Sequence, residues 1–205
     1  MYNLIRMQMW EENAVKKEYI YKIFSRMPTL KTERLTLRKI GLDDIDDMYE
    51  YAKDASLTKF LTWSPHPDKA HTFEYVSYLQ SRYQSGDFFD WAIVLDNKMI
   101  GTCGFTRFDF QNNIGEIGYV VNPDYHGRGI ATEAVGEVIR FGFEKLALNR
   151  IECRFMIQNN ASRRVMEKNG MIFEGALREG MLVKGVYRDI GVCSVLRSEY
   201  EGSRQ

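Results

Sequence analysis

The chain has 205 residues, of which 44% are hydrophobic and 27% charged, as is ordinary for a globular protein. Lysine plus arginine equals aspartate plus glutamate at 28 each, so the formal net charge is zero. That balance argues against a nucleic-acid binder held by a general basic field. No apolar run approaches the length of a membrane span, and the N-terminus lacks a signal-peptide pattern.

Three cysteines lie far apart in apolar stretches, at Cys103, Cys153 and Cys193. No CxxC pair occurs, and the three histidines are not spaced to complete a zinc site. The cysteines are therefore interpreted as small buried side chains in a reducing compartment. The sequence predicts a cytoplasmic protein without a metal.

The first predicted element is a helix over residues 11–26, whose apolar side chains recur at helical spacing between lysines. Pro28 follows and divides the chain into an N-terminal helical extension, residues 1–27, and a single domain, residues 28–205. Such an amphipathic helix packs on either its own domain or a second subunit, and both alternatives, including a homodimer, stay open. A membrane-surface position is disfavoured because Glu11, Glu12 and Glu18 dilute the basic face.

Period-two alternation predicts strands, and helical spacing predicts the segments between them. Asp43 and Asp44 are expected to cap the first helix of the domain, and Gly86 to end the second. Apolar positions of that second helix are Phe73, Val76, Tyr78, Leu79 and Tyr83. The predicted order is strand 34–39, helix 44–53, helix 68–84, strand 89–95, a turn at Asp96–Asn97, strand 98–108 and strand 115–121.

The second half alternates more regularly between helix and strand. Its predicted order is helix 129–146, strand 150–157, helix 161–168 and strands 171–178 and 185–196. A meander followed by these elements predicts an α+β fold, with a mixed sheet and helices on its faces.

The strongest chemical signal is the stretch from Glu116 to Ala134, in which a strand ends, a glycine-rich turn follows and a long helix starts. Glycines let main-chain N–H groups approach a ligand, and a helix N-terminus adds unpaired donors and a positive dipole end. The stretch is therefore interpreted as a phosphate or pyrophosphate site. A Walker A motif is excluded because its lysine is absent, and the strand context does not suit a Rossmann loop.

Three sequence blocks resemble the GNAT superfamily of N-acetyltransferases. His126-Gly-Arg-Gly-Ile-Ala131 resembles its acyl-CoA pyrophosphate loop, with His where Gln or Arg is more common. The segment from Ile157 to Gly170 is similar to its N-x-x-S…V-x-E-K-x-G pattern. Leu30 to Arg38 resembles the opening strand of the RimJ/RimL-like subgroup, which acetylates ribosomal-protein N-termini. The resemblance covers about Leu30 to Tyr200.

The resemblance implies a GNAT-like central sheet, mostly antiparallel, and acetyl-CoA as cosubstrate without a metal. It also implies direct transfer in a ternary complex, which suits a chain without an evident activated nucleophile. A main-chain N–H near Val120 or Val121 would polarise the thioester carbonyl, and Asn159 would form a hydrogen bond with the pantetheine arm. The implied cofactor-binding residues are Val120, Val121, His126, Gly127, Arg128, Gly129, Ile130, Ala131, Asn159 and Ser162.

Two residues are expected to carry the proton transfers. Glu116 is the predicted general base, with a pKa raised by apolar neighbours on its strand; the alternative is a solvent-facing glutamate. Ser162 is implied as the donor to the departing sulfur, with Tyr119 and Tyr125 as alternatives. Arg163 and Arg164 are available for phosphates. Residues 63–67 and 88–91 are the expected acceptor side, with ordinary packing as the alternative.

The expected function is acetyl transfer from acetyl-CoA to a primary amine, the N-terminal α-amine of a protein or peptide, such as a ribosomal protein, being favoured. A small-molecule amine (polyamine, amino sugar, antibiotic or amino acid) is an alternative acceptor. A non-catalytic CoA-binding regulatory module is a third. No nucleic acid and no membrane partner are expected.

Overall fold

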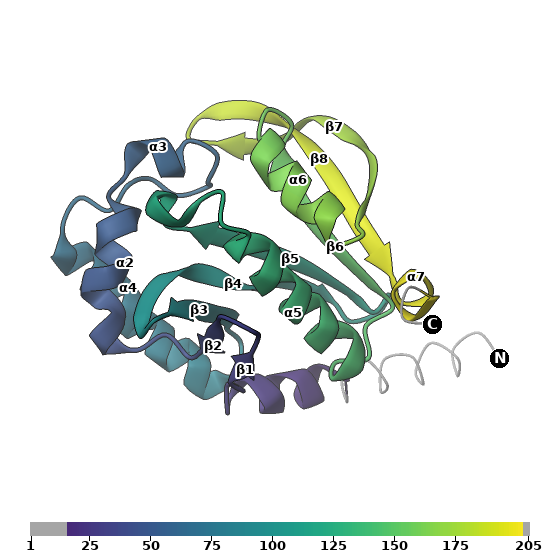
Figure 1. The fold of residues 1–205 in the computed structure, drawn as a ribbon, viewed down its shortest axis with the longest axis horizontal. Helices are drawn as coiled ribbons and strands as arrows, with labels where there is room; N and C mark the ends of the chain where they lie inside the picture. The colour runs from purple at the N-terminus through teal and green to yellow at the C-terminus, as the bar shows by residue number, and fades with distance from the viewer. Residues whose placement is uncertain (1–15, 203–205) are drawn as a thin grey trace, which may run out of the picture.

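The computed structural model describes residues 16–202. Its eight strands form one sheet in the order β1-β2-β3-β4-β5-β6-β8-β7 (Figure 1). The strands are β1 (Leu30–Lys31), β2 (Thr36–Arg38), β3 (Phe89–Leu95), β4 (Lys98–Asp109), β5 (Ile114–Val121), β6 (Arg150–Met156), β7 (Ile172–Val183) and β8 (Val186–Leu196). The helices are η1 (Leu42–Asp44), α2 (Ile45–Ala52), α3 (Ala55–Thr58), α4 (Lys69–Ser85), η2 (Pro123–Tyr125), α5 (Ile130–Glu144), α6 (Asn160–Lys168) and α7 (Arg197–Gly202).

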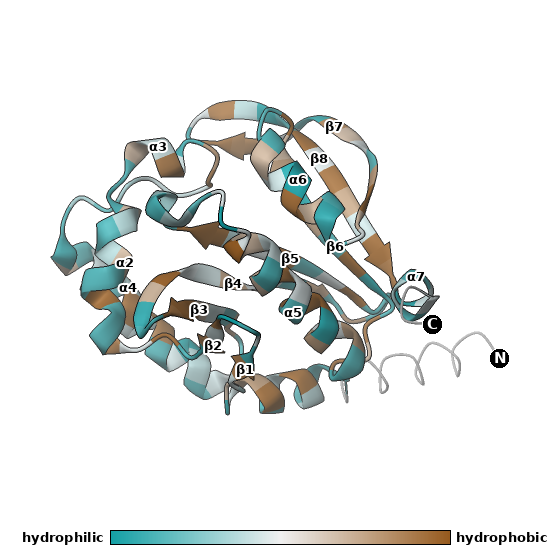
Figure 2. Ribbon diagram, in the orientation of Figure 1, coloured by the Kyte–Doolittle hydropathy of each residue, from teal (hydrophilic) through white to brown (hydrophobic). Residues whose placement is uncertain are grey.

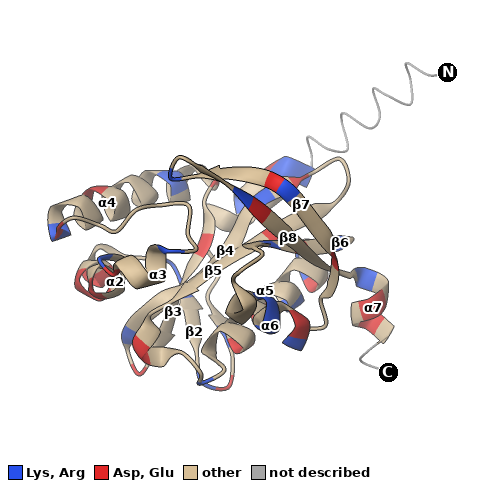
Figure 3. Ribbon diagram, turned by 90° about the horizontal axis from the view of Figure 1, so that it is seen from above, with Lys and Arg blue, Asp and Glu red and all other residues tan. Residues whose placement is uncertain are grey.

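Helices cover both faces of this sheet, as Figures 1 and 3 show from two directions. The larger apolar core joins one face to α5 and α6, and a smaller core joins the other face to α2 and α4. Figure 2 shows the apolar residues concentrated along the central strands and the inner sides of the helices. The predicted α+β fold with a mostly antiparallel sheet is confirmed. The pair β5–β6 is parallel, whereas the other strand pairs are antiparallel.

The N-terminal extension joins the main core in its described part. Residues 16–24 are helical, and Ile20 and Phe24 are fully buried there. The Phe24 ring lies 4.9 Å from that of Phe89 and 5.3 Å from that of Trp91, centroid to centroid. The segment therefore packs on its own chain. Residues 11–15 of the predicted helix lie outside the described residues, and the domain division at residue 27 stays a prediction.

Several turn and cap predictions follow local backbone chemistry. Asp96 and Asn97 both have positive φ, as a tight two-residue hairpin requires, and Gly86 ends α4 in the left-handed region. Asp68 caps α4 by accepting from the His71 N–H at 2.8 Å. Asp44 caps only the short η1 turn, through the Gly41 N–H, because Arg38 binds the rest of its carboxylate.

Two of the five apolar positions of α4 do not face the core. Phe73 and Tyr78 are each 53% exposed, whereas Thr72 is fully buried through its contact with His66. Apolar spacing overstated the buried stripe because large aromatic side chains also occur at exposed positions. The sequence also missed the short elements β1, α3, η2 and α7, which are too brief to show a periodic pattern. Within residues 16–202, no helix is both long and apolar enough to cross a membrane.

Candidate active site

A cleft of about 540 Å³ opens at the end of β5. Its walls come from α3 and the loop after it, from the loop between β5 and α5, and from the first turns of α5 and α6. It is lined by nearly all of the predicted cofactor-binding residues. These are Val120, Val121, His126, Gly127, Gly129, Ile130, Ala131, Asn159 and Ser162, whereas Arg128 does not line it.

The loop before α5 has the backbone that the phosphate prediction needs. Gly127 and Gly129 have φ values of +74° and +77°, and Gly129 is the N-cap of α5 without a side-chain cap. A Cβ at Gly127 would meet nothing within 4 Å. An anion can therefore approach the main chain closely and meet the positive end of the α5 dipole. His126 supports the loop because its Nε2 lies 2.8 Å from the Val121 carbonyl oxygen.

An ion pair and hydrogen bonds between the β1–β2 turn and α5 hold this loop. The Arg34 guanidinium pairs with Glu133 at 2.6 Å and also donates to the Arg128 carbonyl at 3.0 Å. Thr32 donates to the same glutamate, and contacts from these two residues help lower the Glu133 pKa against the opposing effect of burial. Sequence reasoning missed these residues because the partners lie about a hundred positions apart and share no local pattern.

The parallel pairing of β5 with β6 ends at Ile117 and Cys153, although both strands continue. Beyond that point the Tyr119 hydroxyl lies 2.7 Å from the Ser162 hydroxyl and donates to the Ser162 carbonyl at 2.9 Å. Burial raises the pKa of Tyr119, so its proton is firmly held. The two hydroxyls thus form a pair on the wall of the cleft.

The N-terminus of α6 carries Ser162 and forms part of the same wall. Asn159 caps it, with its side-chain oxygen accepting from the Ser162 N–H at 3.1 Å. Arg164 and Lys168 line the cleft and bring positive charge to it. Arg163 does not: it pairs with Glu167 at 2.8 Å and lies over the Phe173 ring. Of the two arginines considered from the sequence, Arg164 is therefore the one available to an anion.

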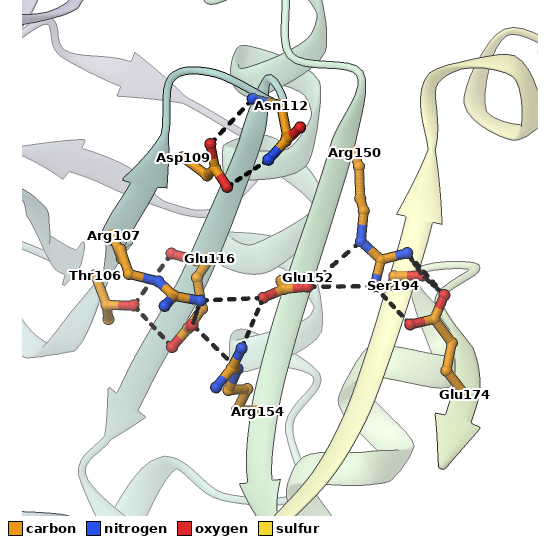
Figure 4. Close-up of polar contacts among 10 residues, drawn as sticks. All are labelled: Thr106, Arg107, Asp109, Asn112, Glu116, Arg150, Glu152, Arg154, Glu174 and Ser194. Carbon is orange, nitrogen blue, oxygen red and sulfur yellow. Dashed lines mark hydrogen bonds and ion pairs between the residues drawn. The ribbon is translucent and has the colours of Figure 1, made fainter. Parts of the chain in front are cut away.

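Glu116 lies apart from these residues and does not line the cleft. Its carboxylate is 3.1 Å from Arg107 and 3.3 Å from Arg154, and Thr106 donates to it at 3.2 Å (Figure 4). Glu152 on β6 pairs with the same two arginines. The expected apolar surroundings of Glu116 are therefore wrong, because its neighbours are two guanidinium groups. Its role as a general base stays a prediction.

The cysteines behave as the sequence indicated. All three are free and buried, and burial raises the pKa of the Cys153 thiol, so that it is no nucleophile. Among residues 16–202, no cluster of histidine, cysteine, aspartate or glutamate could hold a metal ion.

A family model described as an acetyltransferase (GNAT) domain matches residues 34–172. The chain belongs to the GNAT acetyltransferases. The uncharacterized N-acetyltransferase p20 of Bacillus licheniformis is 35% identical over 178 residues, which cover 86% of this chain and all of p20. YdaF of Bacillus subtilis (strain 168), provisionally named as a ribosomal N-acetyltransferase, is 30% identical and covers 84% of this chain and 96% of its own.

Solved GNAT structures share the fold. An acetyltransferase from Bacillus anthracis superposes with a TM-score of 0.75 at 27% identity, covering 84% of this chain and all of its own. RimL, described as a ribosomal L7/L12 alpha-N-protein acetyltransferase in complex with coenzyme A, gives a TM-score of 0.73 at 20% identity, over 82% of this chain and 98% of its own. The predicted family, fold and acetyltransferase activity are confirmed, and fold neighbours bind coenzyme A.

Proposed function

We propose that this GNAT protein transfers the acetyl group of acetyl-CoA to the N-terminal α-amine of a protein or peptide. The observation that carries the proposal is the loop of Gly127 and Gly129 at an uncapped helix N-terminus, opening into a cleft that runs to the end of β5–β6 pairing. Such a loop suits a pyrophosphate, and the separated strands leave β5 main-chain groups accessible to an extended ligand.

The reaction needs four atoms to change partners. The amine nitrogen forms a bond to the thioester carbonyl carbon, the carbon–sulfur bond breaks, the amine loses a proton and the thiolate gains one. Positive charge from Arg164 and Lys168 would hold phosphates. The N–H groups near Val120 and Val121 would stabilise the negative charge on the carbonyl oxygen.

The Ser162 hydroxyl would donate the proton to the thiolate. The contacts with Tyr119 support this role because they hold Ser162 on the wall of the cleft. The Ser162 O–H would turn from the Tyr119 oxygen to the sulfur as the thiolate leaves. Asn159 fixes the turn on which Ser162 lies. Glu116 would take the amine proton through water, since it lies on β5 but outside the cleft lining.

The choice of acceptor rests on two likenesses. The opening block Leu30 to Arg38 resembles the RimJ/RimL-like subgroup, and YdaF is provisionally named for ribosomal acetylation. A cytoplasmic location is in keeping with the three free cysteines.

The test is a transfer assay with purified full-length protein, acetyl-CoA and matched acceptors. The acceptors are a serine-initiated peptide, the same peptide with a blocked N-terminus and one lysine, spermidine and an amino sugar. The proposal predicts acetylation of the free α-amine, detected by mass spectrometry, with the highest kcat/KM. Preference for spermidine or the sugar would support the small-molecule alternative. Binding of acetyl-CoA without any transfer would indicate a regulatory module.

A further inference from the structure

Asp90 is a carboxylate on an otherwise apolar strand, and no lysine or arginine within residues 16–202 pairs with it. It lies near the start of β3, and its Oδ1 atom is buried with no hydrogen-bond partner. The residue as a whole keeps some exposed surface, so its surroundings are not sealed. A buried carboxylate oxygen without a partner costs free energy, which the fold could avoid with a neutral side chain. Such a residue is a candidate for binding rather than for stability.

Two glycines extend from Asp90 across the sheet. In the strand register Asp90 is opposite Gly104 on β4, and Gly104 is opposite Gly118 on β5. A Cβ at Gly104 would lie 2.8 Å from Asp90 Oδ1, so the carboxylate occupies the room that the glycine leaves. A Cβ at Gly118 would lie 2.7 Å from Thr106 Cγ2, so the Thr106 side chain lies over this second glycine. Neighbouring strands are about 4.8 Å apart, so this strip from β3 to β5 is roughly 10 Å long. It ends on β5 next to Tyr119, at the point where β6 separates from β5.

The strip lies on the sheet face that α2 and α4 cover, because Ala92 and Val120, two residues along β3 and β5, belong to that smaller core. The titratable groups whose charges act on Asp90 are Tyr51 on α2, Tyr75 and Tyr83 on α4 and Cys103 on β4. The Thr102 side chain and the Trp91 N–H favour the ionised form of Asp90, against the larger effect of burial. The pKa of Asp90 is raised to about 7, chiefly by burial. No arginine or lysine among the described residues forms an ion pair with it.

The two segments that the sequence assigned to the acceptor side both pack against the smaller core on this face, through Trp63 and Phe88. His66 lies 5.9 Å from the Tyr75 ring and 5.5 Å from the Trp63 ring, and Tyr75 in turn interacts with Asp90. A carboxylate beside aromatic rings, with no cation of its own, has the chemistry that binds an ammonium group.

We propose that Asp90 binds the ammonium group of the acceptor amine, on the sheet face that leads across β4 to the end of β5. This inference rests on the proposed function and names the residue that recognises its substrate. The amine would enter on the α2/α4 face and the cosubstrate through the α5/α6 cleft, so that the two meet where β5 and β6 part.

The kinetic test compares wild type, Asp90→Asn and the control Asp96→Asn, which removes a carboxylate from the exposed turn at the other end of β3. Initial rates are measured against the best acceptor of the panel at saturating acetyl-CoA. For Asp90→Asn we expect KM of the amine to rise about tenfold or more, the loss typical of a charged contact, with acetyl-CoA affinity unchanged. Asp96→Asn leaves KM unchanged. An equal KM in all three proteins overturns the inference.

A second measurement does not depend on turnover. Protein labelled with carbon-13 at aspartate carboxyls is titrated with acid by NMR, with and without propylammonium as the probe. Binding of the cation beside Asp90 lowers the pH midpoint of that one signal in a saturable way, and the Asp90→Asn variant loses the signal. An unchanged midpoint contradicts the inference. If propylammonium binds at Asp90 but no acceptor is acetylated, the proposed function fails while the subsite stands.

Discussion

Replacing Asp90 by asparagine should stabilise the protein, and increasingly so as the pH rises. Burial raises the pKa of Asp90 from 3.8 to about 7. The folded state therefore holds this proton more tightly than the unfolded state. The stability contributed by that proton is complete below pH 3.8 and is lost as the pH rises through 7. Asparagine has the same shape and no charge to desolvate, so it escapes this loss.

The magnitude follows from the pKa difference. One pKa unit corresponds to about 1.4 kcal/mol, so full ionisation costs at most roughly 4 kcal/mol. Asp90 is only half-buried, and solvent reduces this figure. Between pH 5 and 8 we expect the free energy of unfolding of Asp90→Asn to gain about 2 kcal/mol on wild type.

Urea unfolding at pH 5, 6.5 and 8, followed by tryptophan fluorescence, measures that difference because other titrating groups cancel between the two proteins. Asp96→Asn, in an exposed turn, controls for loss of a carboxylate as such. A difference in unfolding free energy between Asp90→Asn and wild type that stays constant from pH 5 to 8 would show that Asp90 does not hold its proton more tightly in the folded state. A wild type that is the more stable protein at pH 8 would also contradict the prediction.

Three further predictions concern packing and catalysis. Phe24→Ala empties a fully buried site and should lower the free energy of unfolding by about 3 to 5 kcal/mol. Tyr19→Ala, at a 52% exposed position on the same helix, should lower it by under about 1 kcal/mol. Equal losses would mean that the helix does not pack as described. Ser162→Ala should lower kcat about 100-fold at unchanged acetyl-CoA affinity, and an unchanged kcat would remove it as the proton donor. Glu116→Gln should lower kcat by roughly 10- to 1000-fold at neutral pH, less as the amine deprotonates at higher pH. Glu152→Gln disturbs the same arginines, so an equal loss there would assign the effect to the ion-pair cluster.

The features that local backbone chemistry dictates could be predicted from the sequence. The glycine loop of Gly127 and Gly129 was predicted because a strand, a glycine-rich turn and a helix follow one another directly in the sequence. The left-handed φ values of both glycines agree with that prediction. The hairpin at Asp96–Asn97 was predicted because these two residues favour a tight turn between strands, and both have positive φ. Each of these signals lies within a few residues of the chain.

Features that depend on strand register could not be predicted. Asp90 was visible as a charge in an apolar run, but its place opposite Gly104 exists only once β3 and β4 are paired. The ion pair of Arg34 with Glu133 likewise joins a turn and a helix that only the fold brings together. Glu116 was expected among apolar neighbours, but Arg154 on β6 pairs with it. That contact depends on the parallel register of β5 and β6, which the sequence does not reveal.

Binding of acetyl-CoA at the Gly127–Gly129 loop is tested by calorimetric titration of acetyl-CoA into wild type, Gly129→Ala and Gly185→Ala. Both glycines have nearly the same φ, +77° and +78°, so the two substitutions impose similar backbone strain. Gly129 lines the cleft, and Gly185, in the β7–β8 turn, does not. A Cβ at Gly185 would meet nothing within 4 Å, so this control substitution adds no clash. We expect tight binding to wild type and Gly185→Ala, and at least about tenfold weaker binding to Gly129→Ala. Equal affinity in all three proteins would contradict binding at this loop.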